Sequence, residues 1–118
     1  MDAPFAPGDD LIFQLESGFG LLRVVAIEGH ATGRVWHLMA YEEFFVDPEA
    51  AEAALRSPES LHVRRAHMAL TDRAFERTPA AKLGNRPVTE NEQSAFQNWR
   101  DRDGHVSDRS ALLMLGIR

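Results

Sequence analysis

The stretch PGDDLIFQLESGFGLLRVVAIEGHATGRVWHLMAY, residues 7–41, holds most of the strong strand-forming residues of this 118-residue chain. Runs of branched and aromatic side chains alternate there with glycine-containing turns, which is the pattern of a β-meander. We expect Gly18 to provide the first turn with a positive φ, which glycine adopts at little steric cost. The three predicted strands are Leu11–Leu15, Leu21–Ile27 and Val35–Tyr41.

Both faces of the second and third predicted strands are largely apolar. In residues 21–27 and 35–41, leucine, valine, isoleucine, alanine, methionine or an aromatic residue occupies both alternating sides of the strand. A sheet of this kind must be covered on both sides. The sequence therefore predicts a small α+β domain, with a strongly bent antiparallel sheet or an SH3-like barrel that carries helices or a partner on its outer face.

Length and composition predict one domain over residues 1–118, able to bury roughly two-thirds of its unfolded-chain surface. The chain has no cysteine, which excludes disulfides and thiolate metal sites. It shows no signal peptide and no apolar run long enough for a membrane span, so a cytoplasmic protein without membrane contact is expected. Residues 1–6 are predicted to form a loosely held leader.

Two helices have clear start signals. Asp47 suits the N-cap and Pro48 the first position of a helix over residues 48–56. Thr89 and Glu92 have the spacing of a capping box, which predicts a second helix over residues 90–102.

The remaining segments have weaker signals. Leu61–Leu70 is predicted to be a fourth strand, followed by a short strand around Phe75 and a turn at Leu83–Asn85. The apolar terminus, residues 107–118, is expected to pack on the core or across a dimer interface, so a monomer and a homodimer both stay open.

Charge is unevenly distributed along the chain, whose net charge is −5. Residues 1–60 hold eleven acids against three arginines, and residues 61–87 hold six bases against two acids. Such asymmetry usually means that the two segments fold against each other. The most acidic local surface contains Glu42, Glu43, Glu49 and Glu52, which a basic protein partner would complement.

Histidine placement does not predict a metal site. His62 and His67 are five positions apart, which puts them on opposite faces of a strand. Asp9 and Asp10 likewise point to opposite faces and should not converge. We therefore expect no metal and no cofactor.

Several short motifs along residues 7–90 occur in the order that a known family shows. They are Gly8-Asp9, Phe13–Leu15, Gly20, Arg23-Val24, Leu61–Phe75, Leu83-Gly84 and Pro87-Val88. Together they resemble the immunity protein 26 family, small proteins of bacterial polymorphic toxin systems. The resemblance covers about residues 7–90. It implies a binding protein that neutralises a toxin and brings no catalytic residues with it.

Three functional hypotheses follow. The first is a non-enzymatic protein-binding module, of immunity type, that covers a basic toxin surface with its acidic face. The second is a nucleic-acid-binding small barrel, which the net charge disfavours; it would use Arg64, Arg65, Arg73 and Arg77. The third is an enzyme, which would need a pocket that gathers His37, Arg23 and a carboxylate.

Overall fold

The computed structural model describes residues 5–29, 33–102 and 104–116, and a five-stranded antiparallel sheet forms its centre. The strand order is β4-β3-β2-β1-β5. The meander predicted within residues 7–41 is confirmed as β1-β2-β3, and the predicted fourth strand is confirmed as β4. The strands are β1 (Asp9–Leu15), β2 (Gly18–Glu28), β3 (Val35–Phe45), β4 (Val63–Thr71) and β5 (Ala80–Asn85).

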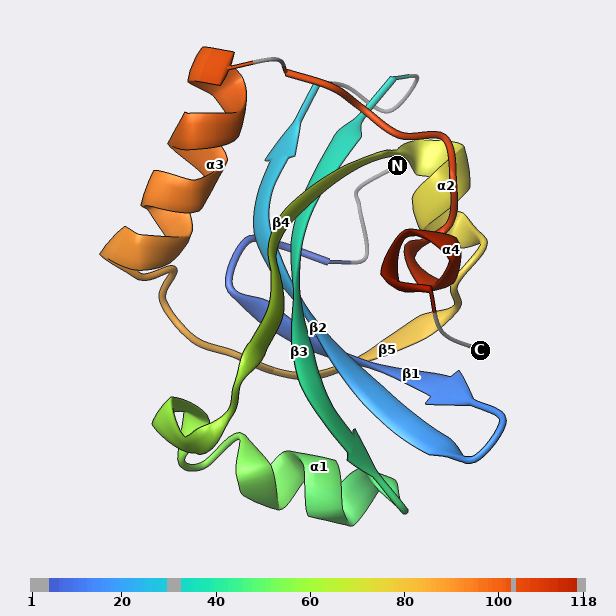
Figure 1. The fold of residues 1–118 in the computed structure, drawn as a ribbon. Coiled ribbons are helices and arrows are strands. Elements are labelled where there is room, and N and C mark those ends of the chain that lie inside the picture. The colour runs from blue at the N-terminus through green and yellow to red at the C-terminus, as the bar shows by residue number, and fades with distance from the viewer. Residues whose placement is uncertain (1–4, 30–32, 103, 117–118) are drawn as a thin grey trace.

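The sheet is open, because β4 pairs only with β3 and β5 only with β1 among the described strands. The α+β class is therefore confirmed, whereas closure into an SH3-like barrel is not shown. The register between β2 and β3 shifts between Gly20 and Leu22 and again between Val24 and Ala26. Such irregularities bend and twist strands, and the resulting curvature of the sheet is visible in Figure 1.

Helices lie on both sides of the sheet: α3 covers one side, and α2 and α4 cover the opposite side (Figure 1). The helices predicted at residues 48–56 and 90–102 are confirmed as α1 and α3. Asp47 caps α1 by accepting a hydrogen bond from the Ala50 N–H, as the sequence predicts. The helices are α1 (Pro48–Ala54), α2 (Asp72–Glu76), α3 (Glu90–Arg102), α4 (Ala111–Leu115) and a short 3-10 turn η1 (Pro58–Ser60).

Each face of the sheet has its own apolar layer, which explains why β2 and β3 are apolar on both sides. One layer includes Leu22 and Leu38 and extends to α2 and α4. The other includes Leu21 and Met39 and extends to α1 and α3. Phe5 packs on the first layer, with its ring edge-on to Trp36 and Phe75, while residues 1–4 of the predicted leader lie outside the described residues.

The short strand predicted around Phe75 is wrong, because that residue lies in helix α2. Thr71 ends β4 and also caps the helix, since its hydroxyl accepts from the Ala74 N–H. A local cap therefore outweighs the strand preference of one aromatic residue.

Two glycine predictions are also wrong. The turn predicted at Leu83–Asn85 is part of strand β5, where Gly84 has no positive φ and pairs with Asp10 of β1. Gly18 begins β2 without a positive φ; a Cβ there would lie 2.5 Å from the carbonyl oxygen of Phe45. Gly18 therefore allows close approach of two strands rather than a left-handed turn.

The C-terminal segment folds back onto β4 and the first apolar layer. Ser107 exchanges backbone hydrogen bonds with β4, to the Thr71 N–H and the Ala69 carbonyl. Beyond it, Ala111 and Leu115 of α4 are buried in that layer. Residues 117–118 of the predicted apolar terminus lie outside the described residues. Across the described chain, every helix is too short or too polar to span a bilayer.

Candidate functional site

The predicted acidic residues gather at one end of the molecule. Glu42 and Glu43 lie near the end of β3, and Glu49 and Glu52 lie on α1, which packs against β2 and β3. Figure 1 shows α1 at the same end as the tip of β3. The side chains of Glu42, Glu49 and Glu52 are exposed.

Glu43 is held in place by His62. Its carboxylate accepts from the His62 backbone N–H at 2.9 and 3.1 Å and contacts Nδ1 of the ring at 2.5 Å. Slight burial would raise the pKa of Glu43, but these hydrogen bonds outweigh it and hold that pKa below its usual value. The same carboxylate raises the pKa of His62. Glu43 is thus an ordered, ionised member of the acidic set.

Exposed apolar residues lie next to these acids along the chain or, for Val63, opposite Tyr41 in the sheet. Val46 is 83% exposed, and Phe44 and Val63 are about half exposed. Large apolar side chains next to charges are typical of the centre and rim of a protein interface. We call this surface the acidic end; its members are Glu42, Glu43, Phe44, Val46, Glu49, Glu52 and Val63.

The four arginines of the nucleic-acid hypothesis contact the chain's own C-terminal segment. Arg64 donates to the Leu115 carbonyl at 2.9 Å and Arg65 to the Met114 carbonyl at 3.2 Å. Arg73 forms an ion pair with the Asp108 carboxylate, and Arg77 donates to the Asp108 carbonyl at 2.9 Å. Arg64 and Arg65 therefore bond the C-terminal segment, although the charge asymmetry favours contacts with residues 1–60.

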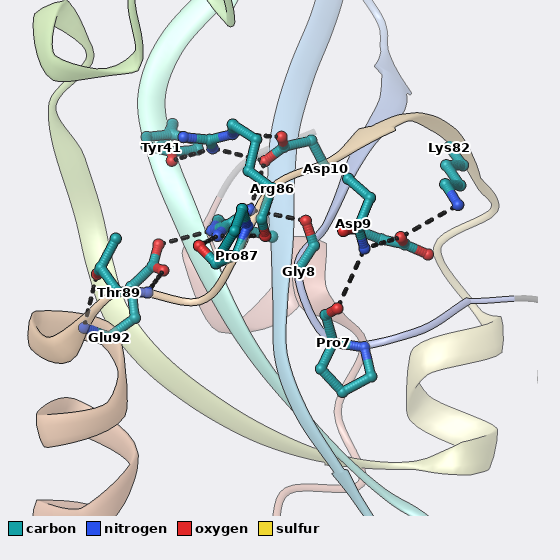
Figure 2. Close-up of polar contacts among 12 residues, drawn as sticks. Pro7, Gly8, Asp9, Asp10, Tyr41, Lys82, Arg86, Pro87, Thr89 and Glu92 are labelled. Atoms are coloured by element: carbon teal, nitrogen blue, oxygen red, sulfur yellow. Dashed lines mark hydrogen bonds and ion pairs between the residues drawn. The ribbon is translucent and has the colours of Figure 1, made fainter.

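A fully buried arginine, Arg23 of β2, joins polar groups from several elements. Figure 2 shows its partners Gly8, Asp10 and Glu92. Arg23 has no exposed surface and donates five hydrogen bonds, the maximum for a guanidinium. Nε bonds Glu92 at 2.7 Å and Nη1 bonds Asp10 at 3.3 Å. The other three acceptors are the backbone carbonyls of Gly8, Arg86 and Pro87.

Arg86 stands on the other side of Asp10. Its Nε and Nη2 bond the two Asp10 oxygens at 2.7 and 2.8 Å, and Nη2 also donates to the Tyr41 hydroxyl at 3.1 Å. The hydrogen bonds to Asp10 raise the pKa of Arg86 against the opposing effect of burial. Here a base of the 61–87 segment does pair with the acidic half, as charge asymmetry predicts.

Asp9 faces away from this network, as the alternation of strand residues predicts. Its carboxylate accepts from the Ala6 N–H and Asn85 Nδ2 and pairs with Lys82 at 3.3 Å. Burial would raise the pKa of Asp9, but these partners together hold it below its usual value.

A second buried cluster joins two histidines. His37 Nδ1 and His67 Nε2 are 2.9 Å apart, and His37 Nε2 lies 2.7 Å from Glu28. With Glu28 ionised, Nε2 of His37 donates to the carboxylate, so Nδ1 of neutral His37 accepts the proton of His67. Phe96 and Trp99 of α3 cover both rings.

Arg23 and His37 do not share the pocket that the enzyme hypothesis requires. Each is buried with its own carboxylate in a separate cluster, and neither side chain lines the cavities of about 560, 230 and 160 Å³. In the described ranges, no three His, Asp or Glu side chains are grouped so that they could hold a metal ion. His62 and His67 contact different partners, in line with their predicted separation.

Comparison with known proteins gives no match: no protein-family model, curated protein or solved structure resembles this chain significantly. The resemblance to the immunity protein 26 family therefore stays a prediction.

Proposed function

We propose that this chain is a protein-binding module that docks a basic partner through its acidic end. The observation that carries the proposal is the exposure of Phe44, Val46 and Val63 beside the acidic residues. Apolar side chains at the centre of an interface supply affinity, while charges around them set partner choice and the rate of association.

The partner class follows from charge. Glu42, Glu49 and Glu52 are exposed and make no ion pair within the part of the chain that the structure describes. A basic surface would complete them. In an immunity protein this surface would belong to a toxin, which the acidic end would cover without any catalytic step, in the cytoplasm of the cell that makes both proteins.

Affinity capture from the organism that encodes the chain tests the proposal. The bait is compared with the triple variant Glu42→Gln, Glu49→Gln and Glu52→Gln, which leaves the Glu43–His62 contact intact. We expect the wild type to retain a protein with a basic surface that the triple variant loses. Growth on co-expression then tests whether that protein is a toxin that this chain neutralises.

A control triple variant, Glu76→Gln, Glu90→Gln and Asp101→Asn, has the same change in charge. These three residues are exposed on α2 and α3. The control bait should capture the partner as the wild type does. A second pair of variants tests the apolar centre: Val46→Ser should weaken capture, whereas Leu113→Ser, 66% exposed on α4, should not. Equal capture by all baits would contradict the proposal.

A further inference from the structure

A cavity of about 560 Å³ lies between β3 and β4, the 3-10 turn η1 and the first turns of α3. This volume lies in the range of small-molecule sites. Its apolar walls are Met39, Leu61, Val63, Ala66 and Ala95. The cavity also has polar lining residues, among which Arg86 carries the only positive charge and can orient a ligand. These residues are Tyr41, Glu59, Arg86, Thr89, Asn91 and Glu92.

Arg86 presents an unused pair of donors. Its Nε and Nη2 are occupied by Asp10 and Tyr41, while Nη1 donates to nothing within the described chain. The bidentate contact with Asp10 fixes the plane of the guanidinium before any ligand arrives. Such pre-organisation favours bonding to a second carboxylate or similar acceptor.

Tyr41 adds a third donor. Its side chain is 6% exposed, and its hydroxyl oxygen accepts from Arg86. The hydroxyl proton has no acceptor among residues 5–29, 33–102 and 104–116. A buried hydroxyl of this kind is expected to find an acceptor, and an oxygen atom of a ligand can supply it.

The carboxylates near the cavity do not satisfy these donors. One carboxylate oxygen of Glu92 accepts a hydrogen bond from Arg23, and the other accepts one from the Thr89 N–H. Asp10 is shared between Arg23 and Arg86. The buried network thus has two cations and two anions and is neutral. Glu59 also lines the cavity, but its side chain is exposed, so water and salt screen its charge. The positive end of the α3 dipole lies at the same cavity.

We propose that this cavity binds a small molecule with an apolar body and one carboxylate, whose oxygens accept from Arg86 Nη1 and the Tyr41 hydroxyl. The apolar body contacts the walls formed by β3, β4 and α3. This cavity shares Val63 with the acidic end, but its proposed donors, Arg86 and Tyr41, lie outside that surface. The binding of a small molecule and the docking of a basic protein can therefore be tested by different substitutions.

Three probes that differ only in their head group test the chemistry: naphthylacetate, naphthylethanol and naphthylethylamine. Amide NMR spectra of the full chain are recorded during titration with each. Naphthylacetate should shift amides of Leu61, Ala66 and Asn91 saturably and bind about tenfold or more tighter than the other two. Equal or tighter binding of the alcohol or the amine would overturn the assignment.

Two substitutions of equal size locate the site. Ala66→Phe fills the cavity from an exposed position of β4, where an aromatic residue suits a strand, and should weaken naphthylacetate about tenfold or more. Ala53→Phe, exposed on α1 and outside the cavity, should leave the affinity unchanged. The dispersion of the amide spectrum shows whether each variant is folded.

Tyr41→Phe isolates the hydroxyl donor, because it keeps the ring. Naphthylacetate should bind this variant about tenfold less tightly, because a hydrogen bond to a charged acceptor is lost. Unchanged affinity in both Tyr41→Phe and Ala66→Phe, with amide shifts elsewhere, would show that the probe binds another surface and would overturn the proposal.

Discussion

Arg23 of β2 donates from Nε to Oε2 of Glu92, at 2.7 Å, and thereby ties α3 to the central sheet. The same Glu92 completes the capping box with Thr89, through bonds in both directions. Burial would raise the pKa of Glu92, but Arg23 and Thr89 outweigh it and lower that pKa. One carboxylate therefore both starts the helix and positions it, and with it one wall of the large cavity.

Replacement of this arginine should destabilise the domain strongly. Lysine in Arg23→Lys keeps the charge but has fewer donors and cannot reach five separate acceptors. We expect a loss of about 3–5 kcal/mol in the free energy of unfolding, measured by urea denaturation, since buried acceptors lose their partner. Arg73→Lys, at an exposed ion pair that water and salt screen, should reduce the free energy of unfolding far less. Similar losses for the two variants would contradict the structural role assigned to Arg23.

The histidine cluster predicts a loss of stability in mild acid. Burial, with smaller effects from His37 and Arg65 and against the effect of Glu28, lowers the pKa of His67 from 6.5 to about 4. The unfolded chain therefore binds a proton between these pH values that the folded chain does not. The contribution of His67 to the free energy of unfolding is therefore complete above pH 6.5 and is lost as the pH drops to about 4. We expect a loss of ~2 kcal/mol, a value reduced to allow for the partial exposure of the ring.

His67→Gln tests this pH dependence, because its amide can still donate to His37 Nδ1 but does not titrate. The slope of stability against pH should flatten between pH 6.5 and about 4, leaving the contribution of His37, whose pKa burial also lowers. His62→Gln is the control: Glu43 raises the pKa of His62, so that contribution is lost as pH rises and not as it falls. An unchanged slope in His67→Gln would refute the assignment.

Two glycines of the sheet should respond oppositely to alanine. A Cβ at Gly20 would lie 2.5 Å from the buried Phe13 ring, so Gly20→Ala should destabilise the domain by about 1–3 kcal/mol. A Cβ at Gly84 would meet nothing within 4 Å, and Gly84 has no positive φ. Gly84→Ala should therefore change thermal stability by less than about 0.5 kcal/mol or raise it slightly. A large loss at Gly84 would favour the turn over strand β5.

The sequence predicted those parts of the fold that have strong local signals. The meander follows from apolar alternation, and α3 from the Thr89–Glu92 spacing. Strand β5 was missed because Gly84 resembles a turn residue, and its strand conformation depends on pairing with distant β1. Helix α2 is short, and its only local signal was the cap at Thr71.

The candidate site was predictable only in part. The acidic residues are close in sequence, so their position at one end of the domain could be predicted. The exposure of Phe44 and Val46 could not, because it depends on which parts of the chain the helices cover. Arg23 did carry a signal, because a lone charge in a strand that is apolar on both sides must be buried with partners. Its partners, at positions far along the chain, required the structure.

The nucleic-acid hypothesis predicts binding that this structure disfavours. Arg64, Arg65 and Arg77 each direct a donor to a backbone carbonyl of residues 108–115, and the Asp108 carboxylate partly neutralises Arg73, so this set is only partly available to phosphates. We expect no change in fluorescence anisotropy when micromolar protein is added to labelled single-stranded DNA or RNA at low salt. Saturable binding that weakens steeply with salt would restore this hypothesis.

The most direct test of the proposed function is the salt dependence of the dissociation constant for the captured partner. Calorimetry at several salt concentrations would compare the wild type with the triple variant of Glu42, Glu49 and Glu52 and with the control triple variant of Glu76, Glu90 and Asp101. The account predicts weaker binding and a shallower salt dependence for the first variant only. Identical affinity and slope for all three proteins would contradict docking through the acidic end.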